Sequence, residues 1–453
     1  MLKRLFKGFK DPEKLAKEYT EEKSAKQERK TYTLKEAAGY VQEQLLEVEE
    51  KEDFRSAMAG DYEAYLKVLK TIEDFLINEQ IAVVGFTNHD LLAKKIYANL
   101  WGLGAVEDEY REPNVDELRV NSPNNIYAVK HGKSHRSNKQ IVANEATIEE
   151  IVKRMIIHDE GKSIDRSKPI VESVRHDNSR LTGLCPPVSK GWHFVLRKHG
   201  TFQMSKENLI ASGTLNQEIW DLLQILVRGR ANILFSGNPG AGKSSLMRKA
   251  VEFMHPSVRI VVIGEDSELN LTEHYPERDV IELEAHPQIG VTMRTLFRTT
   301  LRLDSDCVIV EEFRGAGEAI EAIKACTRGL FGSMASAHFN SPEESVEGTA
   351  MMMLEEGLTL PLELAKLRVA KGFNIVVQMY GDTISGIKKI TEITEIVVED
   401  EKITYSPLIV WKPTGDNFME DGVWETVNQP SNKLINHMSR TVPRSELEAL
   451  GWH

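Results

Sequence analysis

Two spacings of hydrophobic residues divide this 453-residue chain into regions. In residues 1–78 apolar side chains recur at helical spacing among charged ones, which is typical of amphipathic helices. Between residues 80 and 205 short runs of strand character are separated by turn signals such as Ser122-Pro123-Asn124-Asn125 and His131-Gly132-Lys133. The pattern therefore predicts a helical extension followed by a small α+β domain.

Strand-like and helix-like runs alternate in the second half of the chain. The pattern predicts a helix at Glu218–Arg228, strands at Ile233–Ser236 and Val258–Gly264, a helix at Val291–Leu303, a strand at Cys307–Val310 and short strands and turns after Ile403. Such alternation indicates an α/β fold with a mostly parallel central sheet and helices on its faces.

These regions give a predicted plan with five parts. They are a helical N-terminal extension at 1–78, an α+β domain at 80–205, a linker at 206–216, an α/β domain at 217–415 and a C-terminal tail at 416–453. Inside the α/β domain, Ser341 is a predicted N-cap because Pro342 follows at the first helical position and Glu344 lies three residues on.

Composition narrows the class of protein. The 57 Lys and Arg against 69 Asp and Glu leave a formal charge of −12, which argues against a main surface for nucleic-acid backbones but leaves a local basic patch open. The cysteines, Cys185, Cys307 and Cys326, are scattered and predict neither a disulfide framework nor a zinc site. A reducing cytoplasm fits this usage, and no apolar run approaches the roughly 20 residues of a membrane span.

The first ten residues have a separate pattern. Between Met1 and Lys10, Leu and Phe residues alternate with Lys and Arg. Such a basic amphipathic segment can rest on an anionic lipid surface, but a frayed terminus is the more common explanation of such a pattern.

A glycine-rich loop follows the predicted strand Ile233–Ser236 and matches G-x-x-x-x-G-K-[ST]. Glycines let consecutive N–H groups point at a phosphate, Lys243 supplies positive charge to the β- and γ-phosphates, and the Ser244 hydroxyl can ligate Mg²⁺. A predicted helix follows, and its N-terminus favours anions. The predicted nucleotide-binding residues are Gly237, Asn238, Pro239, Gly240, Ala241, Gly242, Lys243, Ser244 and Ser245.

Acidic residues end two of the predicted strands. Glu311 and Glu312 follow Cys307–Val310, and the carboxyl edge of a parallel sheet is also where the phosphate loop opens, so we predict a role in holding Mg²⁺. Since neighbouring strand residues point to opposite faces, one of the pair is expected to face the nucleotide. Glu265 and Glu268 follow the other strand and can orient water, although acidic turns after strands are common without a function.

Arginines and one histidine are weaker candidates. Arg294, Arg298 and Arg302 recur every four residues and predict one charged helix face, which is usually solvated but here precedes the acidic strand and can bring charge near a γ-phosphate. His338 follows a run of small residues, and a lone histidine is more often a core or surface residue.

Taken together, these motifs resemble the secretion ATPases of the type II and type IV systems, the hexameric motors of pilus assembly, protein secretion and conjugation. The matching blocks are the phosphate loop, the acidic box at 263–269, the Walker-B region at 301–315 and the histidine box at 332–338. Outside the motor, 102–104, 114–121, 169–172 and 197–198 resemble the N-terminal domain of the tight-adherence pilus and conjugation branch. The resemblance covers residues 80–415 and leaves 1–78 unmatched.

The resemblance implies roles for single residues. Glu312 matches the catalytic Walker-B glutamate, and Glu265 and Glu268 match acids that act on Mg²⁺ or water. His338 matches a histidine that senses the γ-phosphate, and Arg302 matches an arginine of the helix before the Walker-B strand. Arg180 and Arg197 match arginines of the N-terminal domain that reach the nucleotide when the two domains close. Three positions depart from the pattern: Glu311 replaces a glycine, Leu330 stands where a first histidine is usual, and Ser305 where a proline is usual.

The resemblance further implies a RecA-like motor that uses ATP and Mg²⁺, forms a homohexameric ring and acts at the cytoplasmic face of a membrane with platform or secretion-machinery proteins. Sequence-specific nucleic-acid binding is not expected. Three alternatives remain: a RecA-like motor that translocates nucleic acid, a subunit that binds nucleotide without hydrolysing it, and a P-loop kinase, for which no second phosphate-acceptor motif is visible.

Overall fold

The computed structural model describes residues 31–45, 51–137, 142–159, 161–198, 204–265, 268–312, 318–327 and 329–452. The chain forms two compact units, Met1–Thr201 (unit 1) and Phe202–His453 (unit 2). The basic amphipathic pattern predicted at Met1–Lys10 lies outside the described residues.

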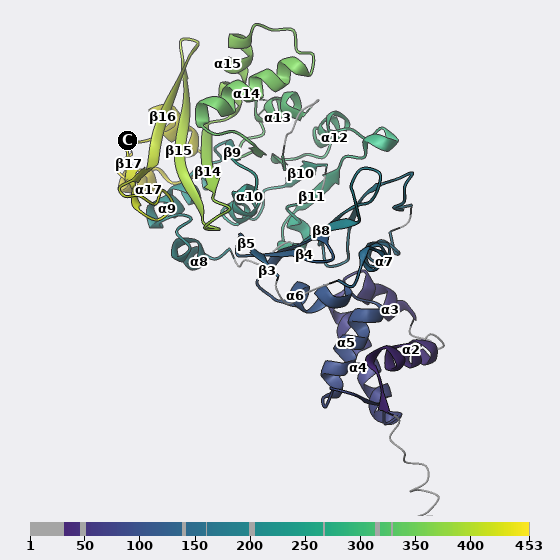
Figure 1. Ribbon diagram of the computed structural model, residues 1–453. Coiled ribbons are helices and arrows are strands. Elements are labelled where there is room, and N and C mark those ends of the chain that lie inside the picture. Colours follow the sequence, from purple (N-terminus) through teal and green to yellow (C-terminus); the bar gives the residue numbers. More distant parts are fainter. Residues whose placement is uncertain are drawn as a thin grey trace, which may run out of the picture. The chain divides into compact units, whose positions relative to one another are not determined.

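Four helices occupy the first described part of unit 1 (Figure 1). They are α2 (Leu34–Leu45), α3 (Lys51–Met58), α4 (Tyr62–Asn78) and α5 (His89–Leu100), with the short parallel pair β1 (Thr31–Tyr32) and β2 (Ala82–Val83) beside them. Asp61 caps α4 by accepting a hydrogen bond from the Ala64 N–H at 2.8 Å, which satisfies one of the free donors of the first turn. Ile72 and Ile96 are fully buried in this bundle.

A sheet follows the helices in unit 1. Among the described residues it has the strand order β5-β4-β3-β8-β7-β6 with antiparallel neighbours throughout. The elements are η1 (Gly104–Val106), α6 (Glu107–Arg111), β3 (Val115–Ser122), β4 (Asn125–Lys130), β5 (Lys133–Arg136), α7 (Glu145–Met155), β6 (Ile170–Val174), β7 (Arg180–Leu184) and β8 (His193–Arg197). Leu118 and Leu196 pack with Ile151 of α7, so α7 covers one sheet face. The side chains that alternate with them on β6, β7 and β8 are at least partly exposed on the other face.

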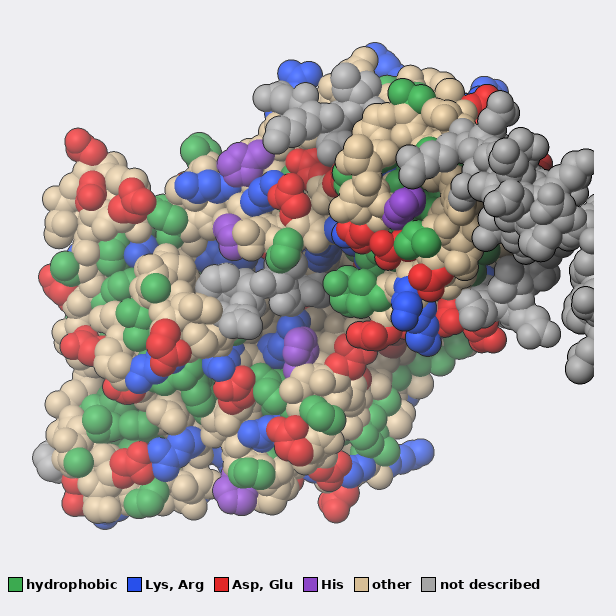
Figure 2. All heavy atoms as spheres, turned by 90° about the horizontal axis from the view of Figure 1, so that it is seen from below, with side chains coloured by type: hydrophobic (Ala, Val, Ile, Leu, Met, Phe, Trp, Pro, Cys, Tyr) green, Lys and Arg blue, Asp and Glu red, His purple; other side chains and the backbone are tan. Residues whose placement is uncertain are grey.

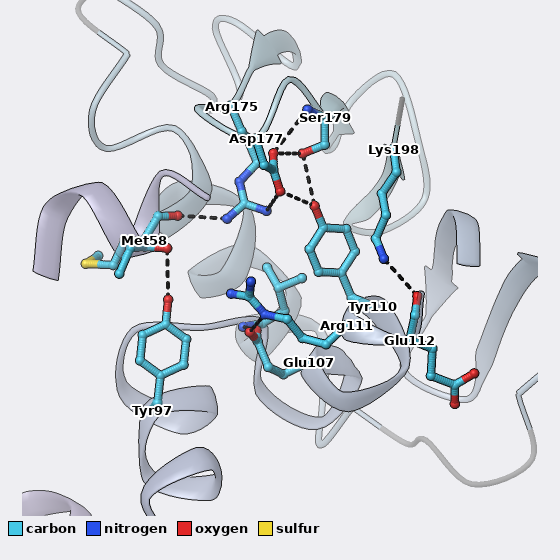
Figure 3. A network of polar contacts seen from close by, with 12 residues as sticks. Met58, Tyr97, Glu107, Tyr110, Arg111, Glu112, Arg175, Asp177, Ser179 and Lys198 are labelled. Carbon is cyan, nitrogen blue, oxygen red and sulfur yellow. Dashed lines mark hydrogen bonds and ion pairs between the residues drawn. The ribbon is translucent and has the colours of Figure 1, made fainter. Parts of the chain in front are cut away.

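Polar contacts join the helices of unit 1 to this sheet (Figure 3). Arg175, in the turn between β6 and β7, is buried and donates to the Met58 carbonyl at 2.8 Å. Asp177, in the same turn, accepts a hydrogen bond from Tyr110 at 2.5 Å. Since buried charged groups need partners to offset their lost hydration, this network fixes the helices on the turn.

In unit 2 the described strands form one nine-stranded sheet, ordered β11-β10-β12-β13-β9-β14-β15-β16-β17. The strands are β9 (Ile233–Gly237), β10 (Ile260–Gly264), β11 (Val280–Glu284), β12 (Cys307–Val310), β13 (Met334–Ala337), β14 (Ile375–Gly381), β15 (Lys388–Glu399), β16 (Lys402–Pro413) and β17 (Gly422–Thr426). Pairings from β11 to β14 are parallel, whereas β14 to β17 are antiparallel. The α/β prediction is confirmed, but the sheet is mixed.

Helices cover both faces of the sheet in unit 2. They are α8 (Lys206–Ala211), α9 (Gln217–Arg228), α10 (Lys243–Val251), α11 (Leu271–His274), η2 (Pro287–Ile289), α12 (Met293–Thr300), α13 (Glu318–Thr327), α14 (Pro342–Glu355), α15 (Leu362–Gly372), α16 (Asn432–Met438) and α17 (Arg444–Ala449). One core holds α9, α10, α16 and α17 against the sheet, and the other holds α12 to α15. The predicted Ser341 cap is present, since its hydroxyl accepts from the Glu344 N–H at 3.2 Å.

Two details of the sequence prediction are wrong. The helix predicted to reach Leu303 ends at Thr300, because tight turns follow and Asp304 takes a left-handed φ of 53°. Arg302 therefore lies outside the helix that carries Arg294 and Arg298. The prediction of short strands after Ile403 is wrong for β16, which belongs to the long antiparallel β15–β16 hairpin, whereas β17 is a short strand.

The charged surface is mixed. Figure 2 shows one face on which Lys and Arg side chains are interspersed with Asp and Glu, with no single large basic field among the coloured residues. None of the described helices combines the length and the apolar character needed to cross a bilayer.

Candidate functional site

The phosphate loop of unit 2 has the geometry that its glycines permit. It runs from the end of β9 into α10, with φ of 152° at Gly237, 78° at Gly240 and 93° at Gly242. A Cβ at Gly237 would lie 2.2 Å from the Met379 carbonyl oxygen, so no larger residue fits there. The positive φ angles turn the backbone tightly before α10, whose N-terminal N–H groups have no partner within the helix.

A side chain of the loop anchors it to β14. Asn238 accepts a hydrogen bond from the Gly381 N–H and donates one to the Gly381 carbonyl, both at 2.8 Å. This two-bond contact holds the start of the loop in place before any ligand arrives.

Three of the predicted residues meet on one side of the loop. The buried Lys243 ammonium donates to the Gly237 carbonyl at 3.0 Å and lies 3.0 Å from His338 Nδ1. His338 Nε2 pairs with Glu312 Oε1. His338 Nδ1 also lies 3.1 Å from the Gly237 carbonyl oxygen, so the lysine ammonium, the imidazole and this carbonyl form one polar cluster. The sequence could propose this chain of contacts only through resemblance, since the residues come from three separate elements.

Ser244 and Glu268 meet on another side. The Ser244 hydroxyl donates to Glu268 Oε2 at 2.9 Å. Behind them, Glu311 Oε1 accepts from the Glu268 and Leu269 N–H groups at 2.9 and 2.8 Å. Burial, and then the nearby Glu268 charge, raise the pKa of Glu311 to about 8, against the lowering effect of these two amides.

The two adjacent glutamates therefore do different things. Glu312 pairs with His338. Glu311 is 4% exposed, and its carboxylate accepts hydrogen bonds from the backbone at Glu268, which holds that segment in place. The predicted role of Glu311 as a Mg²⁺ ligand stays a prediction, and its present contacts are those of a support for Glu268 and Ser244.

Two other predicted residues of unit 2 lie apart from this cluster. Glu265 is exposed directly after β10. Arg302 is exposed on the turn before β12, while Glu312 follows the end of that strand, so β12 separates them. Within its own chain Arg302 is not brought to the phosphate loop.

The predicted arginines of unit 1 lie side by side. Arg180 of β7 and Arg197 of β8 are directly opposite in the antiparallel pairing. Arg197 forms an ion pair with Glu117 of β3 at 3.0 Å, and Arg119 pairs with the same carboxylate. All four residues occupy the sheet face that α7 does not cover.

Sequence reasoning missed Arg248 as part of the cluster. Its guanidinium donates to the Glu268 carbonyl at 2.9 Å and lies 2.7 Å from His274 Nε2. One signal was available, because Arg248 lies four residues after Ser244 on α10 and so shares its helix face. The contact between Asn238 and Gly381 could not be predicted from the sequence, because it depends on the pairing of β14 with β9.

The residues present fit a nucleotide with Mg²⁺. The left-handed glycines form a cradle, Lys243 supplies a cation, and Ser244 and Glu268 supply two oxygens at hydrogen-bond distance from each other. No cluster of three His, Cys, Asp or Glu side chains suited to a metal exists in the described parts of the chain. The hydroxyl of Ser244 and the carboxylate of Glu268 fit a Mg²⁺ ion that also takes phosphate oxygens as ligands.

Similarity to known proteins agrees with this site. The model of a protein family described as type II/IV secretion system protein matches residues 113–378, more than half of the chain. The chain belongs to this family, which confirms the resemblance deduced from the motifs. It is 28% identical over 258 residues to an uncharacterized protein of Methanocaldococcus jannaschii, covering 54% of this chain and 35% of that protein.

Other relatives carry functional names. A putative conjugal transfer protein of Mycobacterium tuberculosis is 26% identical over 257 residues, covering 55% of this chain and 72% of the relative. The type IV secretion system protein VirB11 of Brucella suis is 29% identical over 163 residues, covering 34% of this chain and 44% of VirB11. The matches thus span from about a third to about three quarters of the relatives' own lengths.

Two solved structures are similar at a low level. The VirB11 ATPase of Brucella suis aligns with a TM-score of 0.35 and 20% identity, covering 64% of this chain and 95% of VirB11. The pilus retraction motor PilT with bound ADP aligns with a TM-score of 0.45 and 12% identity, covering 76% of this chain and 88% of PilT.

Proposed function

We propose that this chain is a RecA-like ATP hydrolase that powers a secretion, pilus-assembly or conjugation machine from the cytoplasmic face of a membrane. The observation that carries the proposal is the meeting of Lys243, His338 and Glu312 beside a preformed phosphate loop. Membership of the secretion family supports the same conclusion.

In the proposed mechanism each residue has a separate task. Loop N–H groups and Lys243 bind the phosphates, and Ser244 and Glu268 hold Mg²⁺, which supplies charge neutralisation at the phosphates when it is bound. Glu312 orients the attacking water and accepts its proton, while His338 keeps the Glu312 carboxylate in position and contacts Lys243. Glu265, which is exposed directly after the end of β10, is proposed to orient water at longer range.

Arg180, Arg197 and Arg302 belong to a larger proposal. In a homohexameric ring, closure of residues 80–205 onto residues 217–415 brings Arg180 and Arg197 of unit 1 to the nucleotide, and hydrolysis releases them. Arg302 is proposed to serve a neighbouring copy, because β12 separates it from the loop of its own chain. Platform proteins of the membrane are the proposed partners, and residues 1–78, 206–216 and 416–453 are proposed as extension, linker and tail.

ATP turnover by the purified chain tests the proposal. We expect measurable release of phosphate with Mg²⁺ and none after chelation. A chain that binds ATP but does not turn it over, alone or with membranes, would show a non-hydrolysing subunit instead.

A nucleic-acid motor is the second candidate on motif grounds, but charge disfavours it. The formal charge is −12, and the face in Figure 2 shows no large basic field. Turnover stimulated strongly by DNA in a salt-dependent manner would favour that candidate.

A further inference from the structure

A groove in unit 2 lies away from the phosphate loop, on the side of the sheet covered by α12 to α15. It has a volume of about 690 Å³, α13 forms its base, and α12, α15 and the end of α14 line it. Figure 1 shows α13 beside α12 and near α14 and α15. No residue of the candidate nucleotide site lines this groove.

Cations dominate the rim. The charged residues that line the groove are Arg294, Arg298, Lys324, Arg368, Lys371, Glu321 and Glu356. The lining of the groove therefore carries five positive and two negative charges, although the chain as a whole has a formal charge of −12. Repulsion among like charges in one groove is unfavourable unless an anion is added.

Both acids already have partners. Glu321 is 3% exposed and pairs with Lys324 at 2.7 Å and with Arg294 at 3.7 Å. Glu356 accepts from the Ala319 and Ile320 N–H groups at 3.0 and 3.1 Å, at the start of α13.

The other three cations lack such a partner. Arg298, Arg368 and Lys371 are exposed and form no ion pair with any acid in the described residues. Arg368 and Lys371 are three residues apart, so they present two positive charges on one face of α15.

The floor of the groove is apolar. Ile320, Ile323, Met353 and Leu358 line it between the charged walls. A free inorganic polyanion or a phosphate backbone gains nothing from such a floor, whereas a peptide with apolar side chains among its acids can bury them there.

We propose that this groove docks an acidic segment of a protein partner, anchored by at least one apolar side chain. Acidic side chains pair with Arg298, Arg368 and Lys371, and the apolar anchor packs on Leu358, the partly exposed residue of the apolar floor. The interaction is independent of the nucleotide site, so it can be tested whether or not the chain hydrolyses ATP.

The probe is a fluorescein-labelled peptide of glutamates with leucines along one helical face, titrated with the full chain and followed by anisotropy. We expect saturable binding that weakens as salt rises, and at least about tenfold weaker binding by Arg368→Glu/Lys371→Glu. Lys402→Glu, an exposed charge reversal on β16, is the matched control and is expected to bind like the parent. If the double reversal unfolds, Arg368→Gln/Lys371→Gln decides, with weaker binding expected.

Several results would overturn the proposal, and four of them come from the binding assay itself. The parent chain could fail to bind the peptide, or the double variants could bind it as tightly as the parent does. A peptide whose leucines are replaced by serines could bind as tightly as the original peptide. A change in oligomeric mass on charge reversal would make a second copy of the chain the occupant of the groove. Inorganic polyphosphate and anionic vesicles are titrated in parallel. Displacement of the peptide by either at a comparable charge concentration would also contradict a site that selects acidic peptides.

Discussion

Two buried lysines of unit 2 occupy contrasting surroundings. Lys243 is 6% exposed at the phosphate loop, where its ammonium contacts a backbone carbonyl and an imidazole. Lys389 is 2% exposed on β15, where its ammonium lies 3.6 Å from the ring centre of Trp411 and 4.3 Å from that of Trp424. It also donates to the Gly213 carbonyl at 2.9 Å, in the segment before α9.

The two lysines differ in whether a bound anion can replace the groups that contact the ammonium. Lys243 is the first residue of α10 and lies beside the glycine loop, so a phosphate bound at the helix N-terminus can replace its present contacts. The centres of the two rings beside Lys389 lie 4.6 Å apart and the lysine is 2% exposed, so its charge joins β15 to the segment at Gly213. A buried cation is thus a functional candidate only where an anion can reach it.

Replacing the catalytic candidates is expected to have the largest effect. Lys243→Ala and Glu312→Gln should each lower ATP turnover by about a thousandfold or more, because charge at the phosphates or the base for water is lost. Steady-state phosphate release measures this. Lys249→Ala, on the same helix and paired with Glu252, is the control and should retain turnover. Unchanged rates in both test variants would refute the assignment.

Lys389→Ala should instead act on stability. The change removes a hydrogen bond and two ring contacts and leaves a cavity, which costs on the order of 2–4 kcal/mol of unfolding free energy. Chemical denaturation measures this, with exposed Lys402→Ala as the control. If Lys389→Ala abolished turnover while the unfolding free energy stayed constant, the contrast between the two lysines would be wrong.

A smaller effect is expected in unit 1. Arg197 and Arg119 both pair with Glu117, but domain closure needs Arg197. Arg197→Ala should lower turnover by about tenfold, whereas Arg119→Ala should not. Both should keep the unfolding free energy within about 1 kcal/mol, because each variant leaves the buried Glu117 carboxylate paired with the other arginine. Equal turnover in the two variants would remove the reason to assign Arg197 to the nucleotide.

The smallest effect is a dependence on pH. Burial lowers the pKa of Lys389 from 10.5 to about 8. Between these values the unfolded chain binds more protons than the folded one, so this lysine makes the unfolding free energy rise with pH, by on the order of 1 kcal/mol per unit. Below about pH 8 both states are protonated and the contribution is constant. Lys389→Met should flatten this slope in denaturation curves between pH 8 and 10, and an identical slope would contradict the assignment.

Local signals made several features of this protein predictable. The phosphate loop, the strand Cys307–Val310 and the Ser341 cap depend on residues that are close in sequence, and each is present. The end of α12 was misjudged because the apolar spacing continues to Leu303, whereas the backbone turns after Thr300. Periodicity shows which face is buried but not where the backbone stops being helical.

The sequence by itself determined that the chain has a phosphate loop, acids at two strand ends and membership of the secretion family. Only the tertiary structure decided that Glu312 meets His338 while Glu311 supports Glu268, that β12 separates Arg302 from its own loop, and that Lys389 is enclosed by tryptophans. The reason is physical: these contacts join residues far apart in the chain, and the order and pairing of the strands bring them together.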